Sequence, residues 1–251
     1  MLYRKKRNTS SFLKRRMKKL VLPWIAWSII IYTIRGVLNP IPEFSAMDFL
    51  GRFLSNGVEG IYWFFPAIIS LTLAMPILSM LSNHKRLLWY ITGISFMLFG
   101  IVQPIQKITG LSVTAGITFP VATYYVMYAI LGYLLANTDI SKGYRRAIYI
   151  GAILSLLFRL LFTYYWSTTT GVTDVRTWDY GSFVAVFPAT AVFLIFKNHN
   201  WSNPFYQKHA CTVAKISSCA YGIYLIHIIL LTDVAIGIFG SSVVSVGEIP
   251  A

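Results

Sequence analysis

The sequence predicts an all-α fold, a polytopic integral membrane helical bundle with about seven transmembrane helices and a cytoplasmic N-terminus. The first observation is composition, since hydrophobic residues make up 56% of the 251 residues and charged residues only 12%. A soluble domain carries about 25% charged residues, because it must cover a wet surface. The second observation is that long apolar segments alternate with basic ones along the chain. Much of the surface is therefore expected to face lipid.

Seven apolar segments are long enough, or nearly so, to cross a membrane as helices. Roughly 20 mostly apolar residues are needed to span about 30 Å of hydrocarbon. The sixth segment is short, but its phenylalanines make it strongly apolar. Prolines inside such segments are tolerated, because neighbouring helices can satisfy the freed backbone groups. The predicted spans are residues 20–37, 61–81, 87–105, 117–136, 147–166, 181–196 and 217–240.

The distribution of Lys and Arg predicts the orientation of these spans. When the N-terminus is placed in the cytoplasm, the cytoplasmic segments hold 17 of the 22 Lys and Arg residues. Cytoplasmic loops of membrane proteins carry such an excess. The net charge of +14 therefore marks the ends of spans rather than a nucleic-acid surface. We predict one multi-pass domain over residues 1–251, in the inner (plasma) membrane, with its C-terminus outside.

Several kinds of active site have no support in the sequence. Walker, Rossmann, HExxH and GxSxG patterns are absent. The two cysteines, Cys211 and Cys219, indicate neither a disulfide framework nor a metal site, and no bound cofactor is expected. With eight carboxylates in the chain, a paired-carboxylate glycosidase centre is also disfavoured.

Ionisable residues at membrane depth are candidates for function, because they are costly there unless they are paired or hydrated. Arg159 and His227 lie about 18 and 15 Å into their spans, so they share nearly the same depth. Arg159 is expected either to bind an anion or to form a structural pair. His227 is expected to be either a hydrogen-bonded histidine of the bundle or a catalytic group. Arg35 and Asp233 share a depth nearer the outer face and are predicted to form a structural ion pair or to extend their charged groups to the interface.

A basic run precedes the first span. Its simplest role is to anchor the cytoplasmic end of that span against acidic lipid headgroups. A sharper hypothesis is that Arg16 and Lys19, one turn apart on one helix face, bind the phosphates of a cytoplasmic donor.

Three stretches together resemble a known family of bacterial membrane proteins. The first is a basic run that leads into a proline, FLKRRMKKLVLPWIAWS at residues 12–28. The second contains a Trp-Phe pair, YWFFPAII at residues 62–69, followed by MPIL at residues 75–78. The third is SSCAYGIYLIH at residues 217–227. Their order and spacing are similar to those of the membrane-bound acyltransferase family 3, whose members acylate surface polysaccharides and related glycans.

The resemblance implies a reaction. Members of this family pass an acyl group, usually acetyl or succinyl, from cytoplasmic acyl-CoA to a hydroxyl of a cell-surface or lipid-linked glycan. Acyl-CoA would thus be a co-substrate rather than a bound cofactor. Arg16 and Lys19 fall where the family has an Arg-x-x-Arg motif, with Lys in place of the second Arg. His227 and Arg159 are candidates for supporting roles, and the Tyr62-Trp63 pair is a candidate for lining the site.

Two departures from the family pattern modify this expectation. The catalytic Arg or Lys and His of the family lie on a first span that has no counterpart in this sequence, and Ile61 stands where many members have a His. We therefore expect a partial domain, lacking two spans at the N-terminus and one at the C-terminus, that is inactive alone. Its own catalytic residues stay unknown.

Two other functions fit the same sequence. A transporter or flippase for a glycan intermediate or a small anion could use Arg159 and His227 to line a path, and inverted internal symmetry with broken helices would distinguish it. A structural membrane subunit is the other. Acyl-CoA binding that depends on Arg16 and Lys19 would separate the enzyme from both.

Overall fold

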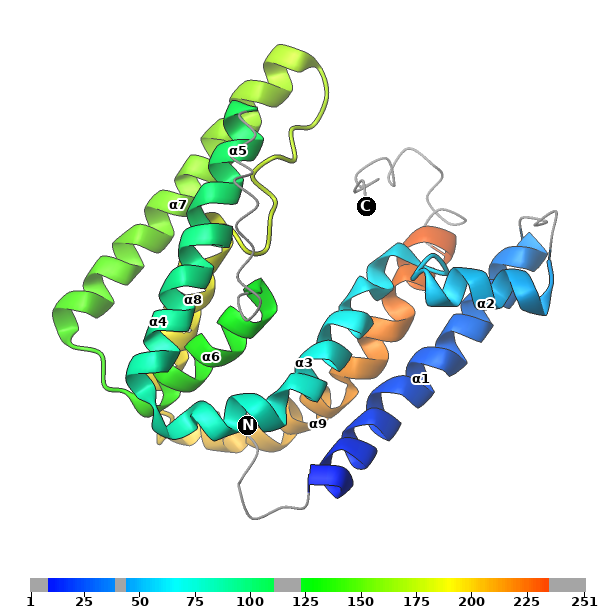
Figure 1. Cartoon of the computed structure of the whole chain (residues 1–251), viewed down its shortest axis with the longest axis horizontal. Helices are drawn as coiled ribbons and strands as arrows, with labels where there is room; N and C mark the ends of the chain where they lie inside the picture. Colours follow the sequence, from blue (N-terminus) through cyan, green and yellow to red (C-terminus); the bar gives the residue numbers. More distant parts are fainter. Residues whose placement is uncertain (1–8, 39–43, 111–122, 235–251) are drawn as a thin grey trace. The chain divides into compact units, whose positions relative to one another are not determined.

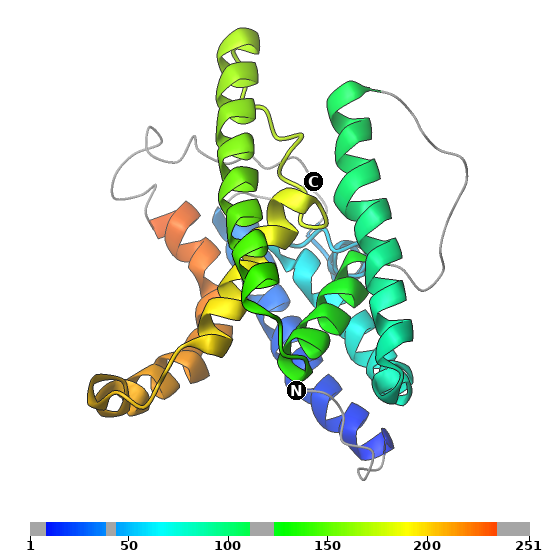
Figure 2. The same cartoon turned by 90° about the vertical axis from the view of Figure 1, so that its left-hand side faces the viewer.

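The computed structural model describes residues 9–38, 44–110 and 123–234, apart from the side chains of residues 38 and 232–234 (Figure 1). Every regular element in these ranges is a helix, which confirms the predicted all-α class (Figure 1). The chain divides into two compact units, which are described separately. Figure 2 shows the same helices from a second direction. Of the described residues, one unit comprises those between 74 and 200, and the other combines those between 9 and 73 with those between 201 and 234.

Helices of membrane-spanning length confirm that the protein is a polytopic membrane protein. Five described segments are long and apolar enough to cross a bilayer: Thr9–Val37, Gly60–Asn83, Lys85–Thr109, Lys142–Thr170 and Pro204–Leu231. Two shorter apolar helices, α6 (Tyr124–Asn137) and α8 (Phe183–Asn198), cover parts of the fourth and sixth predicted spans. Residues 117–122 of the fourth span and residues 235–240 of the seventh lie outside the described ranges. The count of seven and the side on which the N-terminus lies stay predictions.

Several helices extend past the apolar segments that predicted them. α7 (Lys142–Thr170) exceeds the predicted span at both ends, and α9 (Pro204–Ile228) begins well before residue 217. The start of α9 is set by Asn203, whose side-chain oxygen accepts a hydrogen bond from the Phe205 N–H at 2.9 Å, and by Pro204 in the first turn. Hydropathy detects the apolar part of a helix and not its polar extension, so these two helices were predicted too short.

The unit that contains both ends of the described chain is built around an aromatic core. Its elements are α1 (Thr9–Leu38), α2 (Ala46–Leu54), the 3₁₀ turn η1 (Gly60–Trp63), the first part of α3 (Phe64–Met80), α9 and the π-helical η4 (Ile229–Val234). Ile31, Tyr62, Phe65 and Leu225 form its buried cluster. These residues come from α1, η1, α3 and α9, so the cluster joins segments from opposite ends of the sequence.

Phe65 is the centre of that core. Its side chain is fully buried, and its ring stacks on that of Trp24 with the centroids 5.4 Å apart. Tyr62 meets the ring edge-on at 5.3 Å, and Tyr221 and Tyr224 of α9 approach it at 6.0 and 5.9 Å. Tilted and edge-on aromatic pairs of this kind each contribute about 1 kcal/mol beyond the area that they bury. Phe65 therefore holds α1 and α9 to the same point.

The short helix α2 is tied to α1 by polar contacts. Ser45 caps its N-terminus by accepting a hydrogen bond from the Asp48 N–H at 3.1 Å. The Tyr32 hydroxyl donates to Asp48 at 2.7 Å, and Arg52 pairs with the same carboxylate at 2.8 Å. The Tyr32 hydrogen bond and then Arg52 lower the pKa of Asp48, because both stabilise its charged form.

The second unit packs helices in pairs. α7 lies along α8, while α4 (Lys85–Ser95) packs against α6 and continues through the π-helical η3 (Phe96–Val102) into α5 (Gln103–Thr109). Two lysines donate to the last carbonyl groups of α6. Lys85 reaches the carbonyl oxygen of Asn137 at 2.9 Å, and Lys197 reaches those of Leu135 and Thr138, each at 2.8 Å. Cations at the C-terminal end of a helix bind carbonyl groups that have no partner within the helix, and they are attracted to the negative end of the helix dipole.

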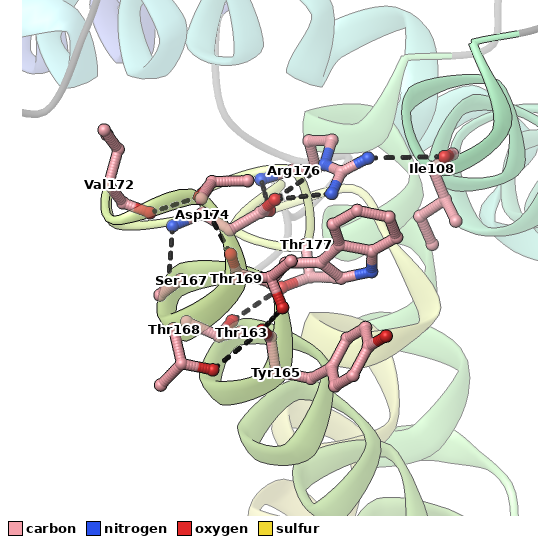
Figure 3. A network of polar contacts seen from close by, with 12 residues as sticks. Ile108, Thr163, Tyr165, Ser167, Thr168, Thr169, Val172, Asp174, Arg176 and Thr177 are labelled. Carbon is pink, nitrogen blue, oxygen red and sulfur yellow. Dashed lines mark hydrogen bonds and ion pairs between the residues drawn. The ribbon is translucent and has the colours of Figure 1, made fainter.

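The connection between α7 and α8 is ordered by Arg176. Its guanidinium pairs with Asp174 at 2.6 Å, stacks over Trp166 at 4.6 Å and Phe162 at 5.2 Å, and donates to the Ile108 carbonyl at 3.4 Å. Figure 3 shows this network against the end of α7, where the Asp174 N–H also donates to the Ser167 hydroxyl. The hydrogen bond from Arg176 lowers the pKa of Asp174.

Replacing Phe65 by alanine is expected to destabilise the protein by about 3 kcal/mol, because the buried ring leaves a cavity between α1 and α9. Phe64→Ala is the matched control, since Phe64 is 38% exposed. Thermal unfolding in detergent should show a clearly larger drop in Tm for Phe65→Ala. Equal drops for the two variants would contradict the central role of Phe65.

Replacing Arg176 by alanine is expected to loosen the connection between α7 and α8. Amide hydrogen exchange over residues 171–181 should become roughly tenfold faster, because an ion pair and two cation–π contacts are lost together. Arg52→Ala, which removes an exposed ion pair from the other unit, should leave that exchange unchanged. Wild-type exchange rates in Arg176→Ala would show that the network does not order this segment.

Candidate functional site

The three sequence stretches singled out above meet in one place. The basic run and its proline lie on α1, the Trp-Phe stretch forms η1 and the start of α3, and the third stretch is the second half of α9. All three contribute to the aromatic core around Phe65. Segments that are far apart in the sequence are therefore assembled into a single cluster within the unit formed by both ends of the described chain.

Three tyrosine hydroxyls fasten this cluster by donating to backbone carbonyl groups of other segments. Tyr62 donates to the Leu225 carbonyl at 3.4 Å, and Tyr221 donates to the Leu20 carbonyl at 3.0 Å. Tyr224 donates to the Ile61 carbonyl. A buried hydroxyl needs a partner, and in apolar surroundings such a bond is costly to break. These bonds fix α9 in register against both α1 and η1.

His227 lies at the edge of the cluster on α9, partly buried. Its Nδ1 is 2.7 Å from the backbone carbonyl oxygen of Tyr224, and the two rings are 5.6 Å apart. A carbonyl oxygen only accepts hydrogen bonds, so Nδ1 must carry the hydrogen. In the neutral ring, the free lone pair is therefore on Nε2, and the imidazole is oriented to accept a proton there.

The predicted Tyr62-Trp63 pair divides into two different environments. Tyr62 is buried in the core, with 1% of its side chain exposed, and its hydroxyl is used in the bond to Leu225. Trp63 is only partly buried and packs edge-on against Phe64 at 6.2 Å. Tyr62 thus belongs to the core that supports the site. Trp63, which is only partly buried, is the member of the pair that can line the site.

Arg35 pairs with a carboxylate that sequence reasoning did not select. Its guanidinium lies 3.0 Å from the Glu59 carboxylate, which is only 14% exposed. The side chain of Asp233, its predicted partner, lies outside the described residues, so the Arg35–Asp233 pair stays a prediction. Glu59 immediately precedes η1, and the contact therefore links the C-terminal end of α1 to the start of the Trp-Phe stretch.

Arg159 lies on α7 in the unit of residues 74–200, whereas His227 lies in the other unit. The guanidinium carbon of Arg159 is 5.3 Å from the centre of the Trp178 ring. A guanidinium over an indole face is attracted by the ring quadrupole and is partly shielded from lipid. The sequence predicted either a bound anion or a structural pair for Arg159, and its contact with the aromatic face of Trp178 was not predicted.

Arg16 and Lys19 lie together on the exposed first part of α1. Both side chains are exposed, and Arg16 is positioned over the Phe12 ring at 5.9 Å. Lys19 immediately precedes Leu20, the residue whose carbonyl accepts the Tyr221 hydrogen bond. The two cations are therefore next to the point where α1 and α9 are joined.

Sequence reasoning assigned no role to the two tyrosines of α9. Tyr221 and Tyr224 are three residues apart, a spacing that places both on one helix face and could have predicted their shared contact with Phe65. Within the described ranges, no group of three His, Cys, Asp or Glu side chains is placed to hold a metal ion.

Comparison with known proteins agrees with the geometry. Residues 1–245 match the model of acyltransferase family 3, which is described as an acyltransferase domain. No curated protein and no solved structure matches the chain. The family match covers all three stretches that meet around Phe65, and the helices that carry them are of membrane-spanning length. The protein therefore belongs to acyltransferase family 3, a family defined by an acyltransferase domain.

Proposed function

We propose that this protein takes part in transferring an acyl group, acetyl or succinyl, from cytoplasmic acyl-CoA to a hydroxyl of a cell-surface or lipid-linked glycan at the inner membrane. Membership of the acyltransferase family supports the reaction class. The observation that carries the proposal is the position of Arg16 and Lys19, exposed on α1 beside the bond that joins α1 to α9.

Arg16 and Lys19 are suited to the phosphate groups of CoA. Arginine and lysine form charge-assisted hydrogen bonds with phosphate oxygens, which are shorter and stronger than neutral ones. Residues three apart on a helix are neighbours on its surface, so both cations can contact one phosphate group or two adjacent ones. Their exposure leaves them accessible to a ligand in water.

His227 lies a short distance along α9 from the proposed donor contacts, Arg16 and Lys19. Tyr221 fixes α9 at the level of Leu20, and His227 is six residues further along the same helix, about 9 Å by the rise of an α-helix. An acyl thioester held by its phosphates near Lys19 would reach along α9 toward the imidazole. Tyr224, whose ring is 5.6 Å from that of His227, and Trp63, which packs on the same Phe64 ring as Tyr224, would line that route.

We propose His227 as a group that accepts a proton in place of the family's base, whose absence from this sequence led to the expectation that the chain is inactive alone. The hydrogen bond from Nδ1 to the Tyr224 carbonyl leaves Nε2 as the acceptor of the neutral ring. A hydroxyl that attacks a thioester carbonyl must lose its proton, and a histidine within hydrogen-bond reach can take it. The thiol of CoA leaves as the new ester forms, so no other reactant is required.

The double variant Arg16→Ala/Lys19→Ala is expected to weaken CoA binding at least tenfold, because two charge-assisted contacts to phosphate are lost. Arg15→Ala/Lys18→Ala is the matched control, since it removes the same charge at the same spacing from exposed positions of the same helix. Calorimetric titration of the purified protein with CoA provides the measurement. Equal weakening by the two variants would reduce the effect to general positive charge, and no binding by the wild type would remove the proposal.

His227→Gln is expected to leave CoA binding within about twofold of the wild type and to lower acyl transfer by roughly a hundredfold, the usual contribution of a general base. The reaction is followed by release of the CoA thiol in membranes that contain the glycan acceptor. His209→Gln, an exposed histidine on the same helix, is the control. If both histidine variants transfer acyl groups at the wild-type rate, His227 takes no part in the chemistry.

A further inference from the structure

A basic hollow lies at the N-terminus of α7, in the unit of residues 74–200. It has a volume of about 260 Å³ and is lined by Lys142, Arg145, Arg146 and Tyr149. Three cations and one phenol on one face of α7 thus border an open space at the polar end of a helix that is long and apolar enough to cross a membrane. None of these residues belongs to the aromatic cluster around Phe65.

The positive charge of this hollow is not compensated by the described part of the chain. The first turn of α7 contains no acidic residue, and the Ser141 hydroxyl makes no capping hydrogen bond. The start of a helix already carries a partial positive charge, so cations placed there repel it and one another. In the described ranges, neither Lys142 nor Arg146 forms an ion pair, and Asp139, the nearest carboxylate in sequence, pairs with Lys197 at 3.7 Å.

The hollow is also partly preorganised. Arg145 donates to the Asn198 side-chain oxygen at 2.6 Å, which fixes its guanidinium against the end of α8. Lys197, the residue before Asn198, is fixed in turn by the carbonyl groups that end α6. The end of α8 therefore holds one wall of the hollow in place, and an anion that enters does not need to order that side chain.

An exposed apolar stripe continues from the hollow along α7. Ile150, Ile153 and Leu157 follow Arg146 at helical spacing, so all four residues share one face of the helix. The three apolar side chains are 52, 60 and 47% exposed. A ligand that places a phosphate among the cations can therefore lay hydrocarbon along the same helix face, whereas a free phosphate ion makes no use of this surface.

We propose that this hollow is a binding site for the headgroup of an anionic glycerophospholipid. The lipid phosphate lies among Lys142, Arg145 and Arg146, and the Tyr149 hydroxyl is placed to bond an ester oxygen or a headgroup hydroxyl. The first part of one acyl chain packs on Ile150 and Ile153. The bound lipid supplies the anion that the start of α7 lacks. This proposal does not depend on the proposed acyl transfer by the other unit.

The test compares retention of phosphatidylglycerol and phosphatidylcholine by the detergent-purified protein, measured by native mass spectrometry. The wild type is expected to retain phosphatidylglycerol preferentially. Lys142→Ala/Arg146→Ala should lose roughly thirtyfold in phosphatidylglycerol affinity, since each basic residue near an anionic lipid contributes about fivefold. Lys208→Ala/Lys215→Ala, which removes the same charge from exposed positions on α9, should behave like the wild type.

Two further measurements make the result decisive. Lys142→Arg/Arg146→Lys exchanges the side chains but keeps both charges, and it should retain the preference even if the alanine variant unfolds. Millimolar inorganic phosphate should not displace the lipid, because it cannot occupy the apolar stripe. The proposal is overturned if the two alanine double variants lose affinity equally, if the wild type shows no preference for phosphatidylglycerol, or if inorganic phosphate displaces the lipid.

Discussion

The contact of Phe65 with four other aromatic rings is the interaction on which the candidate site depends. Apolar helices gain little from one another by the hydrophobic effect inside a bilayer, because lipid tails are equally apolar. Their association depends instead on close packing and on hydrogen bonds between them. Phe65 supplies the packing, and Tyr62, Tyr221 and Tyr224 surround it while their hydroxyls bind backbone carbonyl groups. The same side chains thus provide both contributions at one point.

This arrangement explains why the two ends of the described chain belong to one unit. The start of α1 carries Arg16 and Lys19, and the second half of α9 carries His227, nearly the whole sequence away. Their separation in space is limited by the bond between Tyr221 and the Leu20 carbonyl. The proposed donor contacts and the proposed proton acceptor lie far apart in sequence and need such a fixed point, because small errors in position reduce catalysis strongly.

The sequence predicted the fold class and the order of the helices well, because hydropathy responds directly to lipid exposure. It predicted helix ends poorly, as at α9, where the cap at Asn203 and not apolarity decides the start. Candidate site residues were selected by resemblance to family stretches or by their depth in a span, whereas the side chains that they contact were not predicted. The pairing of Arg35 with Glu59 and the position of Arg159 over Trp178 depend on how helices face each other. Depth along a helix, which a sequence gives, carries no information about that rotation.

The tyrosine hydrogen bonds have a consequence for how this site tolerates mutation. Each hydroxyl binds a main-chain carbonyl group, at Leu20, Ile61 and Leu225, rather than a side chain. Every amino acid supplies that carbonyl group, so the acceptor positions can change identity without loss of the bond, provided that the new side chain fits. The hydrogen bond itself therefore constrains the identity of the tyrosine in each pair and not that of the acceptor residue. Related proteins can therefore vary at positions 20 and 61 and keep the same interhelical geometry, whereas position 225 is also restricted by packing, because the Leu225 side chain is buried in the core around Phe65.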